Sequence, residues 1–218
     1  MNAAAAVVRK DFRLAWRDRT AWLSALAFAT ISVLVYSFAF DLAAVDVRPL
    51  LPGVLWTTFL FAGVFASGQS FQHETDAGTF DAMLVAPVSP TAIFLGKVFA
   101  NVVALMLIEL AVLLLGTMLF DTTLLSVELV LVVAIGTIGY VSLTTLLSTL
   151  GGRVRSRAVL LPVLALPLLV PLLIAGVRAT GDALGEPGDG APWLALLGVF
   201  AAWSTVGGAL IFPLAVER

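Results

Sequence analysis

The sequence contains no cysteine and only one histidine, and these two absences exclude several kinds of chemistry. Without cysteine the chain cannot form a disulfide, a thiolate metal site or a covalent cofactor link through paired thiols. His73 lies close to Glu74 and Asp76, but a single histidine with two carboxylates does not make an ordinary zinc ligand set. We therefore expect no metal ion and no directly bound cofactor.

Charged residues are also scarce. Only 12% of the 218 residues are charged and 61% are hydrophobic, with a mean hydropathy of +1.07. Because a soluble globular domain has about 25% charged residues, this composition predicts an integral membrane protein whose first partner is the lipid bilayer. The net charge of −2 gives no indication of nucleic-acid binding, and we expect none.

Six apolar segments are long enough to cross a hydrocarbon layer about 30 Å thick. We therefore predict an all-α membrane protein with one transmembrane domain over residues 1–218. An amphipathic pattern in residues 4–20 predicts a further helix in the headgroup layer, with Phe12 and Trp16 on its apolar side. The predicted spans are about 21–40, 50–71, 93–120, 129–152, 158–177 and 191–216.

The distribution of lysine and arginine predicts the orientation. If the N-terminus is cytoplasmic, only Arg48 and Arg178 lie outside, and the cytoplasmic side receives the other ten of the 12 basic residues. An even number of spans then places both termini in the cytoplasm, together with the loop after the second span. The ten are Arg9, Lys10, Arg13, Arg17, Arg19, Lys97, Arg153, Arg155, Arg157 and Arg218.

The connector 72–92, between the second and third spans, is the longest polar interruption in the first half of the chain. Gly78 and Thr79 are typical of a helix stop followed by a new cap, Phe80–Ala86 has room for one short helix, and Pro87 ends it. We expect a short, mostly apolar cytoplasmic helix with an acidic flank. A surface of this kind is expected to contact another protein.

The next helix is predicted to begin at Ser89, with Pro90 at its first position. Gly96-Lys97 in that helix resembles the end of a phosphate-binding loop. However, Thr91 and Val98 occupy the places of the required glycine and hydroxyl residue, so the sequence encodes no nucleotide site there. The chain also lacks the G-x-S-x-G and H-E-x-x-H motifs, and we do not expect an enzyme.

Glu109 is the one ionisable residue deep within a predicted span. An unpaired charge there would cost several kcal/mol, so the carboxyl must be protonated, paired or next to water. Two interpretations stay open: a functional site, or a neutral acid that hydrogen-bonds to hydroxyl groups of the fourth span. Those hydroxyls could serve helix packing or line a polar path for a substrate.

Pro162, Pro167 and Pro171 in the fifth span predict a bent or interrupted helix, because each interior proline removes one backbone hydrogen bond. The freed carbonyls need protein or water, so we expect this span to be buried in the bundle. The segment 178–193 that follows is rich in glycine and proline. It is predicted to be a flexible external loop, with short re-entrant helices as the alternative.

These motifs together resemble those of ABC-2-type transporter permeases. The connector contains E-x-x-x-G-T-[FL]-[DE] (Glu74, Gly78, Thr79, Phe80, Asp81), then L-x-x-P (Leu84, Pro87) and Gly96-Lys97. Within that class the chain most resembles the haem exporter protein B family, the membrane permeases of the cytochrome c maturation system. The narrower resemblance comes from L-x-P-G-[IV]-[LI]-W (Leu50–Trp56) and from V-L-L-P-x-L-x-L-P-L-x-x-P-L-L-I in the fifth span (Val159–Ile174).

The resemblance implies a non-catalytic permease subunit in a bacterial plasma membrane, present in two copies. Its implied partners are a separate ATP-binding subunit that holds ATP, other cytochrome c maturation proteins of the membrane and a haem chaperone; haem is the handled substrate. A permease for a lipid, polysaccharide or drug, and a non-transporting scaffold for an ATPase, are the alternatives. The residues implied to couple to the ATP-binding subunit are Glu74, Asp76, Gly78, Thr79, Phe80, Asp81, Met83, Leu84 and Pro87.

Overall fold

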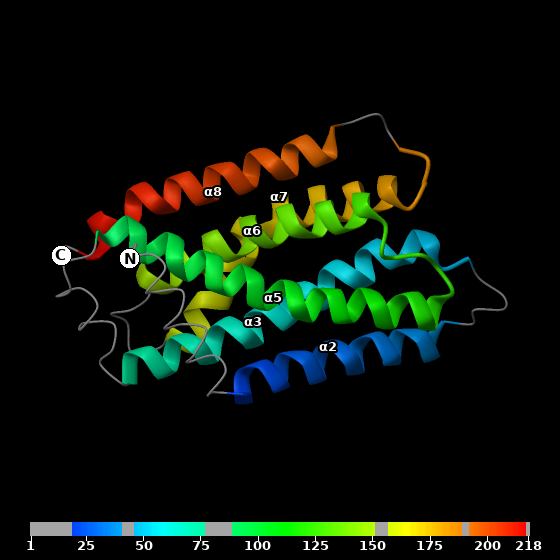
Figure 1. The fold of residues 1–218 in the computed structure, drawn as a ribbon, viewed down its shortest axis with the longest axis horizontal. Helices are drawn as coiled ribbons and strands as arrows, with labels where there is room; N and C mark the ends of the chain where they lie inside the picture. Colours follow the sequence, from blue (N-terminus) through cyan, green and yellow to red (C-terminus); the bar gives the residue numbers. More distant parts are fainter. Residues whose placement is uncertain (1–18, 41–45, 77–88, 151–156, 189–191, 217–218) are drawn as a thin grey trace.

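The computed structural model describes residues 19–40, 46–76, 89–150, 157–188 and 192–216. Within these ranges the regular structure is helical throughout, and six helices are long and apolar enough to cross a membrane (Figure 1). The predicted all-α membrane fold is therefore confirmed, whereas residues 4–18 of the predicted interfacial helix lie outside the described residues. The elements are α2 (Arg19–Ala39), η1 (Arg48–Leu50), α3 (Leu51–Asp76), α5 (Pro90–Phe120), α6 (Val127–Leu150), α7 (Arg157–Ala183) and α8 (Trp193–Val216).

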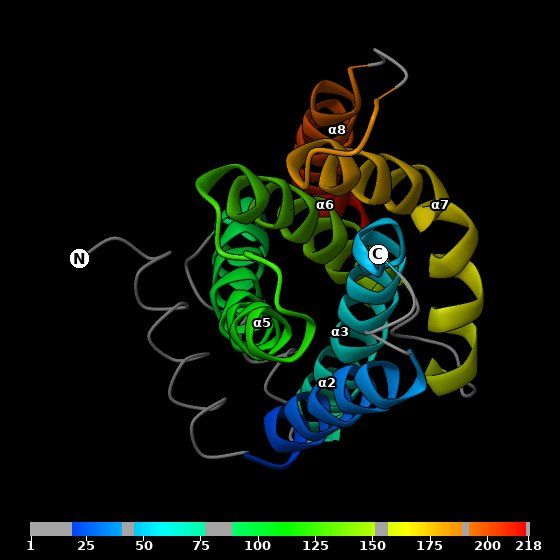
Figure 2. The same ribbon diagram turned by 90° about the vertical axis from the view of Figure 1, so that its right-hand side faces the viewer.

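Helix α6 lies in the middle of the bundle. It packs against α5, α7 and α8 and also touches α3, as the end-on view in Figure 2 shows. One cluster of buried side chains joins these five helices, and a second cluster joins α2 to α3 and α5. Helix α2 is thus attached at the edge of the bundle, and most of its surface is free to face lipid.

Small side chains attach α2 to the bundle. Ala25, Ala29 and Val33 follow one another at four-residue spacing and are fully buried. Residues spaced in this way share one face of a helix, and small side chains on that face allow two membrane helices to approach closely. The opposite face carries exposed apolar side chains such as Ile31 and Phe38, as expected for a helix in contact with lipid.

Serine side chains cap the starts of α5 and α6. The predicted cap at Ser89 is confirmed: its hydroxyl accepts a hydrogen bond from the backbone N–H of Ala92, and Pro90 is the first helical residue. Helix α5 ends where Asp121 adopts a left-handed conformation with φ of 49°. Ser126 then caps α6 by accepting from the N–H of Leu129. The tight turn makes α5 and α6 an antiparallel hairpin.

Helix α7 distinguishes between the two alternatives predicted for the fifth span, a bent helix and an interrupted one. Its helical assignment is unbroken through all three prolines, so the helix is not interrupted, although Figure 2 shows that it curves around α3. Pro167 and Pro171 are exposed, and the buried face is formed instead by Leu169, Leu172 and Ala175. The expectation that this span is buried in the bundle was therefore wrong for the face that carries Pro167 and Pro171.

Two helices are longer than predicted. Helix α7 continues past Arg178 to Ala183, so the first part of the predicted external segment 178–193 is helical. Gly185, with φ of +79°, then follows the helix end, and the N–H of Glu186 bonds to the carbonyl of Gly181. Similarly, α3 continues beyond residue 71 to Asp76. In both cases the apolar run ends before the helix does, because backbone hydrogen bonds persist outside the hydrocarbon.

Candidate functional site

The described part of the connector 72–92 belongs to the helices on either side of it. Glu74 and Asp76 lie in the last turn of α3, and Pro90 begins α5. The end of α3, the start of α5 and the end of α8 lie at the same end of the molecule, on the left in Figure 1. The other predicted coupling residues lie outside the described residues: Gly78, Thr79, Phe80, Asp81, Met83, Leu84 and Pro87.

The helix that leaves the connector is fixed to α8. Phe94, one turn into α5, is fully buried, and its ring centroid lies 5.4 Å from that of Phe212. The same ring covers Gly208, where a Cβ atom would come closer than carbon atoms can approach without a shift. The hydroxyl of Thr91 donates to the carbonyl of Ala209 over 3.4 Å. A displacement of the connector would therefore act on α5 and α8 together.

The intramembrane carboxyl group lies at the contact between α5 and α6. Glu109 is only 2% exposed, and its Oε2 lies 2.6 Å from Oγ1 of Thr137. Thr137 is itself buried and also lies 2.8 Å from the carbonyl oxygen of Val133 in its own helix. The carboxyl group of Glu109 therefore lies within hydrogen-bond distance of a hydroxyl of the fourth span.

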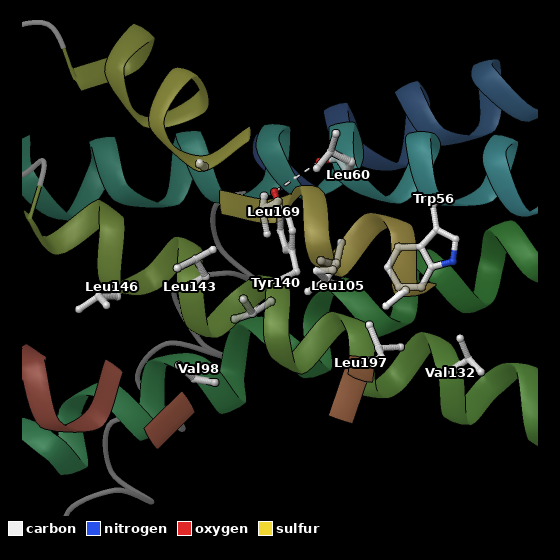
Figure 3. Close-up of a cluster of buried hydrophobic side chains, with 14 of the residues drawn as sticks. Trp56, Leu60, Val98, Leu105, Val132, Tyr140, Leu143, Leu146, Leu169 and Leu197 are labelled. Carbon is white, nitrogen blue, oxygen red and sulfur yellow. Dashed lines mark hydrogen bonds between the residues drawn. The ribbon is translucent and has the colours of Figure 1, made fainter. Parts of the chain in front are cut away.

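Next to this pair, Tyr140 links α6 to α3. Its hydroxyl donates to the backbone carbonyl of Leu60 over 3.3 Å, the dashed line in Figure 3. The ring lies over Gly63, where a Cβ atom would be 2.5 Å from the tyrosine ring. Gly63 therefore allows α3 and α6 to pack closely, because any larger side chain would push Tyr140 away.

The side chain of Trp56, which belongs to α3, lies as a wedge against α6 and α7. It extends from α3 toward α6 (Figure 3) and covers Gly136 of α6 and Gly176 of α7, each of which would meet the ring with any added Cβ. Its indole N–H donates to Oγ1 of Thr180 in α7 over 2.9 Å. Both the wedge and its hydrogen bond are buried, so the pair fixes how far α3, α6 and α7 stand apart.

Removing the acceptor of this hydrogen bond should destabilise the protein by about 1 kcal/mol. Thr180→Val keeps nearly the same shape but leaves the buried indole N–H of Trp56 without its acceptor. Thr57→Val is the matched control, because Thr57 is exposed and bonds only to carbonyls of its own helix. We expect thermal unfolding of the purified protein in detergent to shift for Thr180→Val alone. Equal shifts for the two variants would contradict this role.

A cavity of about 10 Å³ lies between the side chain of Trp56 and the carboxyl group of Glu109. That volume is close to the minimum for a single water molecule, whereas pockets for small-molecule ligands are about 300 Å³ or more. The cavity therefore fits a water and not an organic substrate. It is lined by Trp56, Phe59, Leu60, Leu105, Glu109, Gly136, Thr137, Tyr140, Leu172 and Leu173.

The other hydroxyls of α6 serve packing. Ser142 and Thr205 of α8 hydrogen-bond over 2.8 Å, and Ser204 of α8 donates to the carbonyl of Gly139. Thr144 and Ser148 bond to carbonyls of their own helix, as hydroxyls in membrane helices often do. These contacts favour the packing interpretation over a polar substrate path. Within the described ranges, no group of three or more His, Cys, Asp or Glu residues could hold a metal ion.

Comparison with known proteins decides the family. A family model described as CcmB protein matches residues 2–218. The chain belongs to the CcmB protein family. Among its relatives, Heme exporter protein B of Rhodobacter capsulatus is 27% identical over 198 residues, which cover 90% of this chain and 91% of the relative. Heme exporter protein B of Bradyrhizobium diazoefficiens is 27% identical over 197 residues, 88% of each chain. The family predicted from the motifs is confirmed.

Two motifs that indicated the CcmB family meet in the structure. Trp56 ends the motif at the start of the second span, and Leu172 and Leu173 belong to the motif of the fifth span; all three line the same cavity. The sequence did not indicate that Trp56 contacts Gly136 and Gly176. Glycines within apolar runs were the available signal, but a glycine does not show which ring will cover it.

Proposed function

We propose that this CcmB-family chain is the membrane subunit of a haem export system for c-type cytochrome biogenesis. The observation that carries the proposal is the family match over nearly the whole chain, joined by two relatives named as haem exporters. The six apolar helices give the chain the form of a multi-pass membrane transport component. The chain itself is non-catalytic, and the energy comes from ATP hydrolysed on a separate ATP-binding subunit.

Coupling to that subunit occurs through the connector 72–92. Phe80, Met83 and Leu84 present apolar side chains to the ATP-binding subunit, and Glu74, Asp76 and Asp81 meet basic residues on it. The packing of the flanking helices supports this assignment, because α5 is joined to α8 by Phe94 directly after the connector. A movement of the connector would then be transmitted to α3 on one side and to the α5–α8 pair on the other.

The connector end of the bundle faces the cytoplasm in this proposal. Arg19 at the start of α2, Lys97 near the start of α5 and Arg157 at the start of α7 mark that end, while Arg48 before α3 and Arg178 near the end of α7 mark the other. Basic residues concentrate on the cytoplasmic side of membrane proteins. The working complex contains two copies of this chain, two ATP-binding subunits, further membrane proteins of cytochrome c maturation and a haem chaperone.

Replacing Leu84 with aspartate should disrupt the complex. A carboxylate placed in an apolar docking site costs more than about 1.4 kcal/mol, so the amount of ATP-binding subunit that co-purifies should fall at least about tenfold. In a strain that lacks the natural gene, Leu84→Asp should fail to restore haem-bound c-type cytochromes, which the unaltered chain restores. Affinity purification and haem staining of the membrane fraction measure the two effects.

Leu125→Asp is the matched control, because Leu125 is 40% exposed in the connection between α5 and α6, at the opposite end of the bundle. It should leave both readouts unchanged. Normal co-purification of Leu84→Asp would refute docking through the connector. Normal c-type cytochromes in the deletion strain would refute the haem-export function itself and favour a permease for another substrate.

A further inference from the structure

The hydroxyl group of Thr137 has one hydrogen but two neighbouring oxygen atoms. Both contacts can be hydrogen bonds only if one neighbour supplies a second hydrogen. Two oxygen atoms lie within hydrogen-bond distance of Oγ1 of Thr137: Oε2 of Glu109 at 2.6 Å and the carbonyl oxygen of Val133 at 2.8 Å. A threonine hydroxyl has one hydrogen to donate. The carbonyl oxygen can only accept, so the protonation state of Glu109 decides whether both contacts are hydrogen bonds.

An ionised Glu109 would leave one of the two contacts without a hydrogen. A carboxylate only accepts, and it would compete with the carbonyl of Val133 for the single hydrogen of Thr137. A neutral carboxylic acid donates its own hydrogen to Thr137, and Thr137 then donates to Val133. The short oxygen–oxygen distance fits both the ionised and the neutral form of Glu109. Only the neutral acid supplies enough hydrogens for both contacts of Thr137 to be hydrogen bonds, which favours the neutral acid.

Among the described residues that line the cavity beside Glu109, none is positively charged. Tyr140 is the other titratable group that lines the cavity, and its hydroxyl hydrogen is directed to the carbonyl of Leu60. The indole N–H of Trp56 is directed to Thr180. The remaining lining is apolar apart from Thr137. A carboxylate without a cation at this depth would cost several kcal/mol.

We propose that Glu109 is a proton-binding site of the resting protein, at which a neutral carboxylic acid donates to Thr137 and thereby joins α5 to α6. The single-water cavity beside it is the place where this proton exchanges with a water molecule. The chain of donors runs from Glu109 to Thr137 to the carbonyl of Val133. Loss of the proton would turn the hydrogen of Thr137 toward Glu109 and leave the Val133 carbonyl with one hydrogen bond fewer. The inference concerns the chain's own interior and does not depend on the identity of the exported substrate.

Infrared spectroscopy of the purified full chain at neutral pH tests this proposal. We expect the carbonyl stretch of a protonated carboxylic acid in the unaltered protein, and labelling with ¹³C-glutamate should move it to lower frequency. The band should disappear in Glu109→Gln, which keeps a donor for Thr137 and should still assemble with the ATP-binding subunit. It should move to higher frequency in Thr137→Val, where the acid loses its acceptor, and return toward its original position in Thr137→Ser.

Glu186→Gln is the control for the assignment. Among the described residues, Glu186 also has a buried carboxyl oxygen, Oε1, and this oxygen has no hydrogen-bond partner there. The band should persist in this variant. A spectrum without a glutamic-acid band at neutral pH would overturn the proposal, even if no variant could be purified. A band that is lost with Glu186 instead, or one that is unmoved by Thr137→Val, would overturn it as well.

Discussion

Gly136→Val is expected to leave very little folded protein. A Cβ atom at Gly136 would overlap the ring of Trp56, and the same ring is so close to Gly176 that a Cβ atom there would overlap it too, which leaves the ring little room to retreat from a new side chain. Overpacking a filled site usually costs about 1–3 kcal/mol and sometimes more. Because the ring packs closely against glycines of two helices, we expect a loss of at least about 3 kcal/mol, a large part of a typical stability of about 5–15 kcal/mol.

The measurement is the yield of monodisperse protein on size-exclusion chromatography in detergent, followed by thermal unfolding of what remains. Gly198→Val in α8 is the matched control, because a Cβ at Gly198 would meet nothing within 4 Å. Its yield should stay close to that of the unaltered chain. Trimming the wedge in the double variant Trp56→Leu with Gly136→Val should recover part of the lost yield. Equal yields from Gly136→Val and Gly198→Val would show that the wedge does not hold the bundle together.

Gly208→Val is expected to cost about 2–3 kcal/mol, the upper part of the usual range for overpacking. A side chain at this position would enter the ring of Phe94, which is fully buried and already packs against Phe212. Since Phe94 lies in the first turns of α5, the substitution should also push the start of that helix away from α8. We therefore expect both a lower unfolding temperature and weaker co-purification of the ATP-binding subunit.

The neighbouring residue provides the control for this experiment. A Cβ at Gly207 would meet nothing within 4 Å, so Gly207→Val changes the same helix by the same group without a clash. Phe94→Leu in the Gly208→Val background should restore part of both readouts, because the smaller side chain leaves room for the valine. A double-mutant cycle over the two positions measures this coupling. Additive effects, without recovery, would contradict a direct contact between Phe94 and position 208.

The sequence predicted the six spans and the start of α5 well, because these follow from local properties. A hydrocarbon layer requires a long apolar run, and Ser89 followed by Pro90 is a sufficient signal for a helix start. The ends of α3 and α7 were predicted too early, since polar residues mark where the hydrocarbon ends and not where the helix ends. For Glu109, the sequence reduced the interpretations to two, and only the position of Thr137 shows which oxygen atoms meet.

What the sequence did not predict is the pairing of glycines with aromatic rings. Gly63 with Tyr140, Gly136 with Trp56 and Gly208 with Phe94 each join residues far apart in the chain. The same amino acids could form other pairs in another bundle, so the pairing depends on which helices are neighbours. The outward direction of Pro167 and Pro171 was missed for the same reason, because a proline in a sequence does not show which side of its helix faces a neighbour.

The size of the cavity beside Glu109 limits which molecules can enter the core of the bundle. The cavity beside Glu109 has room for about one water molecule, so a flat macrocycle does not fit into it. A larger molecule could enter there only if α3, α6 and α7 moved apart, and the hydrogen bond from Trp56 to Thr180 opposes that movement.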